Sequence, residues 1–296
     1  MRAIAIINQK GGVGKTTTAV NLSAALAQAG KRVCLIDLDP QAHASLHLGL
    51  ETGGQEPSVY DVLTSDASLA DVQREIEPGL FVAPSHIDLA AAELELAGVV
   101  GRELIVREKL AAIRGQFDYV LIDCPPSLGV LTLNALCAVD EVILPLQPHF
   151  LALHGMSKLL ETIELVALRL NSRLRLSGVA LCLFESGTRL AAEVSRDVEA
   201  FFASARGTNK PWSDVTLFRT PIRRNIRLAE APSFGQSIFQ YAADSNGAAD
   251  YRELALELLE SGEPRAESGE PEGKAEGGGR RAEAAVAEQR LPSLSR

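Results

Sequence analysis

The sequence has few cysteines, few aromatic residues and no long apolar stretch, and each shortage excludes a class of protein. Four widely separated cysteines among 296 residues, with no CxxC pair, argue against a disulfide-stapled secreted domain and against a zinc or iron–sulfur centre. No run reaches the ~18 apolar residues that a membrane-spanning helix needs, and the apolar run at the N-terminus is too short for a signal peptide. We therefore predict a cytoplasmic protein with free, buried thiols at Cys34, Cys124, Cys137 and Cys182.

The chain also lacks an excess of positive charge. Its formal net charge is -9, so no overall field attracts nucleic acid, and any binding to DNA must use a local basic patch. The residues are 46% hydrophobic and 23% charged, which is enough for a full-sized core. Because aromatics make up only 5%, the apolar content is mostly Ala, Leu, Val and Ile, and that mixture favours helices packed on a parallel sheet.

Short apolar runs alternate with helical patterns as far as residue 261. The runs are continuously apolar, which indicates strands buried on both faces of a sheet. We predict a doubly wound, mostly parallel α/β fold, with helices on both faces and ligands bound at the carboxyl ends of the strands. The expected strands are 3–8, 32–36, 80–83, 119–122, 141–146 and 177–184. The expected helices are 17–29, 103–114, 128–138, 155–170, 190–205 and 248–261.

The composition changes after this region to Gly, Glu, Ala, Arg and Pro without apolar periodicity. We therefore expect two parts, a folded domain over residues 1–261 and a disordered low-complexity tail over residues 262–296. The motifs described below all lie in the first part.

A glycine-rich segment, KGGVGKTT, follows the first expected strand and opens the first expected helix. Glycines let backbone N–H groups approach a polyphosphate closely, and the start of a helix adds unpaired N–H groups and a positive dipole end. We expect Lys15 to contact the β- and γ-phosphates and the Thr16 hydroxyl to bind Mg²⁺. This P-loop predicts nucleotide contacts from Lys10, Gly11, Gly12, Val13, Gly14, Lys15, Thr16 and Thr17.

The loop departs from the standard P-loop pattern, because Gln9 occupies the first glycine position and Lys10 follows it. In this it resembles the deviant Walker A group of the ParA/MinD/Soj ATPases, whose signature is KGGxGK[ST]. The resemblance implies that Lys10 reaches the nucleotide of the opposite subunit in a dimer that encloses two ATP molecules. Lys10 and Lys15 would then both be catalytic, since two positive charges would face the transferring phosphoryl group.

Two acidic strand ends extend the resemblance. Asp123 ends the run YVLID before Cys-Pro-Pro, as in the Walker B strand of that family, and its carboxylate is expected to hold Mg²⁺ through water. Asp39 lies in DLDPQ and matches the DxDPQ switch segment, which implies that Asp39 positions or activates the attacking water and that Asp37 helps to shape the metal site. The expected metal-site residues are Thr16, Asp39 and Asp123.

Two later positions depart from the family pattern. Ala42-His43 stand where the family usually has Gly-Asn, a change that concerns the geometry of the switch and the rate rather than the reaction. His149 and His154 occupy a segment that usually carries glutamates in related sequences. Either imidazole could titrate near neutral pH, although surface histidines usually have no function.

The segment RRNIRLAEAPS closely resembles an element of the partition ATPases that lies near the adenine and contributes to DNA binding. The resemblance places Pro232 near the base. Four arginines within nine residues also predict a sequence-nonspecific, salt-sensitive patch for DNA phosphates. These arginines could instead pair with the surplus acids of the chain. They are Arg219, Arg223, Arg224 and Arg227.

One position counts against DNA binding. Relatives often carry D-x-R-T after the corresponding strand, and here Gly187 stands at the arginine position, with Arg189 two residues further on as a possible substitute.

Taken over residues 1–260, the resemblance implies an Mg²⁺-dependent ATPase that dimerises with ATP, binds DNA nonspecifically on the nucleoid, and segregates or positions chromosomal or plasmid DNA, or another cargo, with a ParB-like partner. Because the loop begins at residue 10, we expect no helix-turn-helix domain before it. A MinD-like ATPase that cycles on membranes is the alternative, but it needs a basic amphipathic C-terminal helix, and the last nine residues hold a proline and almost no apolar face. A metal-cluster enzyme of the same superfamily would need paired cysteines.

Overall fold

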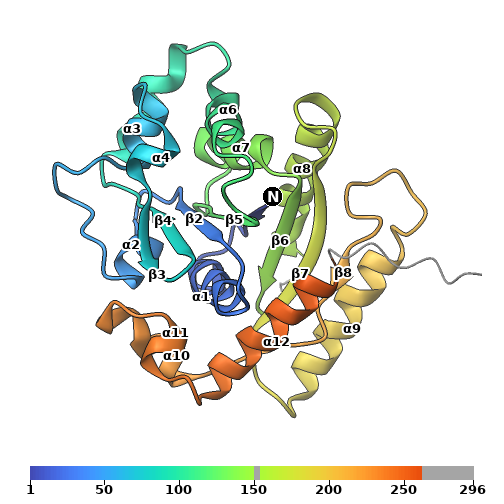
Figure 1. The fold of residues 1–296 in the computed structure, drawn as a ribbon. Coiled ribbons are helices and arrows are strands. Elements are labelled where there is room, and N and C mark those ends of the chain that lie inside the picture. Colours follow the sequence, from blue (N-terminus) through green and yellow to red (C-terminus); the bar gives the residue numbers. More distant parts are fainter. Residues whose placement is uncertain (150–153, 262–296) are drawn as a thin grey trace, which may run out of the picture. The chain divides into compact units, whose positions relative to one another are not determined.

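The computed structural model describes residues 1–149 and 154–261, and a single sheet forms its centre (Figure 1). The strands follow the order β3-β4-β2-β5-β1-β6-β7-β8, and β9 pairs separately with β7. All pairs are parallel except β3 with β4. The strands are β1 (Arg2–Ile6), β2 (Val33–Asp37), β3 (Arg74–Glu77), β4 (Leu80–Ala83), β5 (Tyr119–Asp123), β6 (Glu141–Leu146), β7 (Arg175–Phe184), β8 (Thr216–Leu217) and β9 (Ile222–Arg223).

Helices cover both faces of this sheet, so the predicted doubly wound α/β class is confirmed (Figure 1). Helices α1 and α12 pack against each other on one face, while α6, α7 and α8 lie on the other. The helices are α1 (Lys15–Gln28), α2 (His43–His47), α3 (Val59–Thr64), α4 (Leu69–Val72), α5 (Leu89–Glu95), α6 (Ile105–Ala112), α7 (Val130–Ala138), α8 (Ser157–Arg169), α9 (Arg189–Ala203), α10 (Ile226–Glu230), α11 (Ile238–Tyr241) and α12 (Asn246–Glu260).

The central strands are apolar on both sides because each side faces its own layer of helices. In β1, Ala5 contributes to the hydrophobic cluster under one layer, and Ile4 and Ile6 contribute to the cluster under the other. All three side chains are fully buried. Burying a side chain the size of isoleucine contributes roughly 1.5–3 kcal/mol, so this short strand is fixed between the two layers mainly by its own composition.

The six predicted strands are all present, with ends within two residues of the expected ones. Strands β3, β8 and β9 were not predicted from the sequence. They are short and lie at or beside the edges of the sheet, and β3 has no fully buried residue, so none shows a continuous apolar run. The predicted helices are also present, and the 103–114 pattern divides into a short 3₁₀ turn and α6.

The ends of neighbouring strands set the position of a binding site. The chain passes from β1 to β2 on one side of β1, while β6 pairs with β1 on the other side, so the carboxyl end of β1 lies where the winding direction reverses. Such reversals leave a crevice at the strand ends. No helix within residues 1–149 and 154–261 is long and apolar enough to cross a bilayer. The predicted tail, residues 262–296, lies outside the described residues.

Candidate nucleotide-binding site

The glycine-rich loop between β1 and α1 has the backbone that its sequence predicts. Gly12 and Gly14 adopt left-handed conformations with φ of 73° and 95°, and Gly14 is the residue from which α1 begins. A side chain in this region costs about 1–2 kcal/mol. The two glycines therefore let the loop curl over the first turn of α1, where free N–H groups can meet an anion.

The two lysines of the loop are held in different ways. Lys15 is only 8% exposed, and its ammonium donates to the Lys10 carbonyl at 3.3 Å. The Lys10 N–H donates to Asn8 Oδ1 at 3.0 Å, and the Asn8 amide donates to the Pro145 carbonyl of β6 at 2.7 Å. The exposed Lys10 ammonium contacts Nε2 of His149, whose pKa is lowered by burial and by the lysine charge.

Three carboxylates lie at the ends of two adjacent strands. Asp37 and Asp123 occupy paired positions at the ends of β2 and β5, and Ile6 of β1 is the neighbour of Asp123 on its other side. Both acids are fully buried, and Asp39, two residues beyond Asp37, is 7% exposed. The register of the parallel sheet thus gathers these acids beside the phosphate loop.

Asp123 is buried without compensation. Neither carboxylate oxygen has a hydrogen-bond partner of normal geometry among the described residues. Burial raises the pKa of Asp123 well above its ordinary value, the charge of Asp37 raises it further, and the nearby Thr16 hydroxyl and Lys15 ammonium act in the opposite direction. A buried, unpaired carboxylate beside a threonine hydroxyl fits a divalent cation, because oxygen ligands are those that Mg²⁺ prefers. Thr16 and Asp123 would hold Mg²⁺, which when bound neutralises charge on the phosphates.

Asp37 differs from Asp123, because both of its carboxylate oxygens accept hydrogen bonds. One accepts the N–H of Asp39 at 3.2 Å, and the other accepts the N–H and hydroxyl of Ser45 at 2.9 and 2.7 Å. Burial raises the pKa of Asp37 to about 6 in spite of these bonds. Ser85 completes the network by donating its hydroxyl to the Asp39 carbonyl at 2.7 Å. In this structure Asp37 therefore ties α2 and the segment around Asp39 to the end of β2.

The switch segment contains one unusual backbone conformation. Ala42 has φ of 53°, in the left-handed region that favours glycine. It occupies the position at which the sequence departs from Gly-Asn, so the substituted alanine keeps a backbone that glycine would adopt without strain. Asp39 Oδ1 accepts the N–H of Gln41 at 3.0 Å just before this turn.

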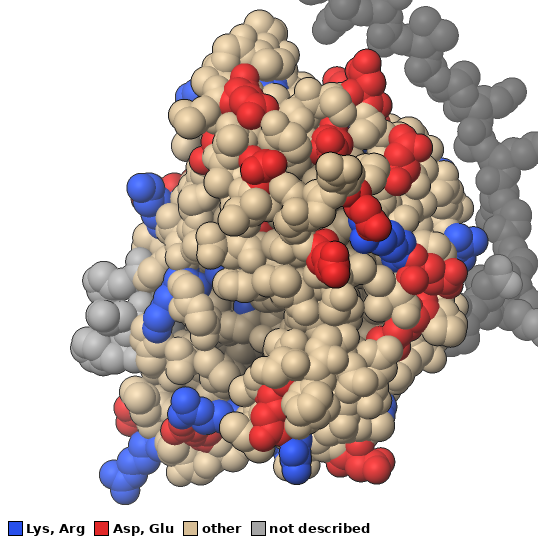
Figure 2. Space-filling view, turned by 90° about the vertical axis from the view of Figure 1, so that its left-hand side faces the viewer, with Lys and Arg blue, Asp and Glu red and all other residues tan. Residues whose placement is uncertain are grey.

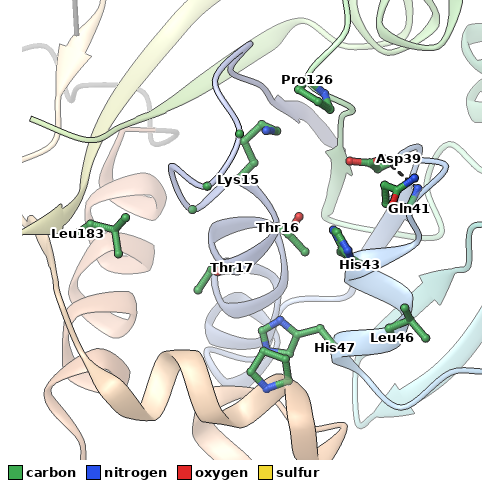
Figure 3. A pocket seen from close by; sticks show the side chains of 14 residues that line it. Lys15, Thr16, Thr17, Asp39, Gln41, His43, Leu46, His47, Pro126 and Leu183 are labelled. Carbon is green, nitrogen blue, oxygen red and sulfur yellow. Dashed lines mark hydrogen bonds between the residues drawn. The ribbon is translucent and has the colours of Figure 1, made fainter. Parts of the chain in front are cut away.

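A cavity of about 550 Å³ joins the loop to the switch segment (Figure 3). In Figure 3, Lys15, Thr16 and Thr17 lie at its centre, Asp39 and α2 lie on one side, and Leu183 lies on the opposite side. The cavity brings together most of the predicted residues, including Pro232 from the distant 223–233 segment. Those predicted residues are Gly11, Gly12, Gly14, Lys15, Thr16, Thr17, Asp39 and Pro232.

Three predicted residues do not line this cavity. Val13 and Asp123 are both buried, and Asp123 is close enough to the Thr16 hydroxyl for that group to lower its pKa. Lys10 is exposed outside it. The structure adds wall residues that the sequence did not mark as nucleotide contacts, although Gln41 and Pro126 belong to the DxDPQ and D-x-P-P motifs. These wall residues are Gln41, His43, Leu46, His47, Pro126 and Leu183.

His47 is the most buried of the added polar residues, with 3% of its surface exposed. Its Nε2 has no hydrogen-bond partner among the described residues. Burial lowers its pKa to about 4, and a hydrogen bond to the backbone of Gln236 partly opposes this shift. The imidazole is therefore neutral at physiological pH.

Each arginine of the predicted DNA patch is paired with a carboxylate in the structure. Two of the pairs join Arg224 to Glu185 and Arg227 to Glu230, each at 2.9 Å. The remaining pairs join Arg219 to Glu257 and Glu260, and Arg223 to Asp250. Basic and acidic side chains are likewise interspersed over the face seen in Figure 2. The pairing that the acid surplus suggested is thus present, and the role of these arginines in DNA binding stays a prediction.

Comparison with known proteins agrees with this geometry. A family model described as "AAA domain" matches residues 1–176. The sporulation initiation inhibitor protein Soj of Bacillus subtilis is 44% identical over 262 residues, covering 88% of this chain and 99% of Soj. The chain belongs to the ParA/Soj family of partition ATPases. The chromosome partitioning protein ParA of Caulobacter vibrioides is also 44% identical, with 88% and 94% of the two chains covered.

Solved structures share this fold, and one of them holds a nucleotide. A Mycobacterium smegmatis protein described as cobyrinic acid a,c-diamide synthase, bound to an ATP analogue and magnesium, is 38% identical with a TM-score of 0.74, over 88% of this chain and 94% of that one. MinD of Pyrococcus furiosus is 25% identical with a TM-score of 0.70, over 88% and 99% of the two chains. This ParA/Soj protein is an ATPase that uses ATP and Mg²⁺.

Proposed function

We propose that this partition ATPase is a nucleotide-dependent switch that dimerises with ATP, binds DNA nonspecifically and positions chromosomal or plasmid DNA, or another cargo. A ParB-like partner stimulates hydrolysis and so ends each cycle. Around the cavity, the loop N–H groups and Lys15 would bind the phosphates, Thr16 and the buried Asp123 would hold Mg²⁺, and Asp39 would orient the attacking water. Pro232 and Leu183, which both line the cavity, contact the nucleoside.

The position of Lys10 carries the dimer part of the proposal. Lys10 does not line the cavity of its own chain, although it begins the loop that does. Its backbone is fixed through Asn8 and Lys15, while its ammonium lies at the surface against His149. A lysine held in this way can reach a phosphate across a dimer interface more readily than one in its own pocket. A second positive charge would there stabilise the charge that spreads over the transferring phosphoryl group.

Two variants separate dimerisation from hydrolysis. We expect Asp39→Ala to form a dimer with ATP and to hydrolyse almost none of it, because the phosphate loop and Lys10 remain intact. We expect Lys10→Ala to stay monomeric with ATP while still binding one nucleotide per chain. Size-exclusion chromatography with light scattering, together with phosphate release, measures both. A monomeric Asp39→Ala or a dimeric Lys10→Ala contradicts this division of roles.

DNA binding is tested with the full chain and random-sequence duplex DNA. We expect retention with ATP or a slowly hydrolysed analogue, weak retention with ADP, and a steep loss of affinity as salt increases, because phosphate contacts release counterions. Lys10→Ala serves as the control that binds nucleotide without forming the dimer. If the wild-type chain with ATP is not retained by DNA at low salt, the DNA part of the proposal is wrong.

A further inference from the structure

The four arginines of the predicted DNA patch differ in how firmly their carboxylate partners hold them. The partner of Arg223 is Asp250, whose side chain is only 6% exposed. Asp250 accepts the Arg223 backbone N–H at 2.9 Å and guanidinium N–H groups at 2.5–3.1 Å. Moving the Arg223 guanidinium onto a DNA phosphate would leave a buried carboxylate with only a backbone N–H, which is unfavourable. Arg223 therefore belongs to the fold, where it ties β9 to α12.

The carboxylate partners of Arg219 hold its side chain less firmly than Asp250 holds Arg223. The Arg219 guanidinium is 78% exposed and makes only long contacts of 3.5 and 3.3 Å, to Glu257 and Glu260. Glu257 is nevertheless satisfied by other groups, because it accepts the N–H groups of Arg219 and Thr220 at 2.8 Å and the Thr220 hydroxyl at 2.6 Å. The carboxylate of Glu257 thus serves the backbone turn, and the Arg219 side chain contributes little to holding it.

The pair between Arg224 and Glu185 consists of a single contact between two side chains that are both more than half exposed. The side chains are 70% and 56% exposed and share one N–O contact of 2.9 Å. An ion pair between two exposed side chains is weak and exchanges readily. Arg227 and Glu230 are more constrained, at 54% and 37% exposure, because Glu230 also accepts the Tyr241 hydroxyl at 2.9 Å.

Arg189 lies four residues after Glu185, at the start of α9, and is exposed. No carboxylate partner is found for it within the described parts of the chain. The loop that joins β7 to α9 therefore presents one unpaired arginine and one acid that neutralises Arg224. Glu185 and Arg189 flank the same short loop, so a phosphate that binds at this loop meets the negative charge of Glu185.

We propose that Glu185 is an internal competitor of DNA, whose carboxylate occupies Arg224 until a DNA phosphate replaces it. The DNA-contacting surface then includes Arg189, Arg224 and Arg227, and Arg223 is not part of it. Glu185 weakens DNA binding in two ways, since its ion pair must break and its charge then repels the phosphate. This inference rests on the proposed DNA binding of the ATP-bound dimer.

The test compares two variants that carry the same charge change. Glu185→Gln removes the competitor, and Glu56→Gln is the matched control, because the 71% exposed Glu56 also pairs with an arginine, Arg74 in β3 at the opposite edge of the sheet. Binding of random-sequence duplex DNA to the full chain is measured with ATP analogue over a series of salt concentrations. We expect Glu185→Gln to bind roughly three- to tenfold more tightly than wild type at low salt, and Glu56→Gln to differ little.

Arg224→Gln, alone and combined with Glu185→Gln, shows whether the gain acts through the arginine. The gain should disappear in the double variant, and Arg224→Gln alone should reduce the slope of log affinity against log salt by about 0.9, the value for one lost phosphate contact. If wild type binds DNA and the two glutamate variants behave alike, the competitor role is wrong and the proposed function stands. If neither wild type nor any variant is retained, the proposed DNA binding is itself wrong and this inference falls with it.

Discussion

The buried histidine beside the nucleotide cavity should make the stability of the nucleotide-free chain depend on pH. His47 has its pKa lowered from 6.5 to about 4 by burial. Above pH 6.5 the imidazole is neutral in both the folded and unfolded chain, so it makes no pH-dependent contribution. As pH falls below 6.5, the unfolded chain takes up a proton that the folded chain refuses until about pH 4. The free energy of unfolding therefore falls through this window.

The size of the effect follows from the shift. One pH unit of difference in pKa corresponds to about 1.4 kcal/mol, so the complete loss is roughly 3 kcal/mol, of which about 2.5 kcal/mol is reached by pH 4.5. Asp37 acts with the opposite sign in the same range, because its pKa is raised to about 6 and its folded form binds a proton more tightly than the unfolded form. The curve of the wild type alone is therefore flattened, and the comparison with a His47 variant isolates the histidine.

The assay is urea unfolding followed by circular dichroism at several values between pH 7.5 and 4.5, on wild type and on His47→Gln without nucleotide or Mg²⁺. At pH 7.5 we expect the variant to be less stable by about 1 kcal/mol, since the hydrogen bond to the Gln236 backbone is altered. By pH 4.5 the variant should be more stable than wild type by roughly 1.5 kcal/mol, because it carries no group to protonate. Stability curves that stay parallel over this range would show that His47 is not held neutral by burial, and the reasoning would fail.

Three further substitutions test local features of the site. Ala42→Gly should raise the free energy of unfolding by about 1 kcal/mol, since glycine adopts a φ of 53° without strain; a lower melting temperature would contradict this. Asp123→Asn should stabilise the metal-free chain, by an amount that grows as pH rises, because an ionised Asp123 has no partner, and it should abolish Mg²⁺-dependent phosphate release. Retained hydrolysis would exclude Asp123 from the metal site. Arg223→Ala should lower stability by about 2–3 kcal/mol, because the buried Asp250 carboxylate loses its charged partner and keeps only the backbone N–H of residue 223. A variant as stable as wild type would assign Arg223 to the surface instead.

Local chemistry made much of this structure predictable from sequence. Continuous apolar runs indicated the central strands because both faces of the sheet are covered, and Gly12 and Gly14 indicated the loop because only glycine adopts its backbone readily. The pairing of the arginines could not be assigned in the same way. Arg224 and Glu185 are 39 residues apart and Arg223 and Asp250 are 27 apart, and only the path of the chain brings them together. The composition shows that acidic residues are in excess, but it does not show which acid pairs with which arginine.

The residues that form the walls of the cavity could not be predicted from the sequence for a related reason. Leu183 lies at the end of β7 and His47 lies in α2, and neither belongs to a polar motif. Their place in the cavity follows from the strand order, which sets the end of β7 near the start of α1 on one side and the segment after β2 on the other. A sequence pattern can identify the residues that bind a phosphate or its metal ion, because few residue types can do so. It identifies the surrounding wall poorly, because many residue types can fill that space.

The proposed nucleotide site contains a buried charge without a partner, whereas the charges of the proposed DNA surface are already paired. This difference bears on how the two sites could be linked. At the nucleotide end, Asp123 is buried without a partner, so a bound cation would relieve an existing cost and stabilise the arrangement around it. At the proposed DNA end, Arg224 and Arg227 are already satisfied within the chain, so a phosphate must displace a carboxylate and gains little from a single contact. Tight DNA binding on such a surface requires several weak exchanges at once. A dimer presents two such surfaces, so it can replace twice as many carboxylates with DNA phosphates as a monomer can. The difference in DNA affinity between dimer and monomer would therefore be larger for arginines paired with carboxylates than for free arginines.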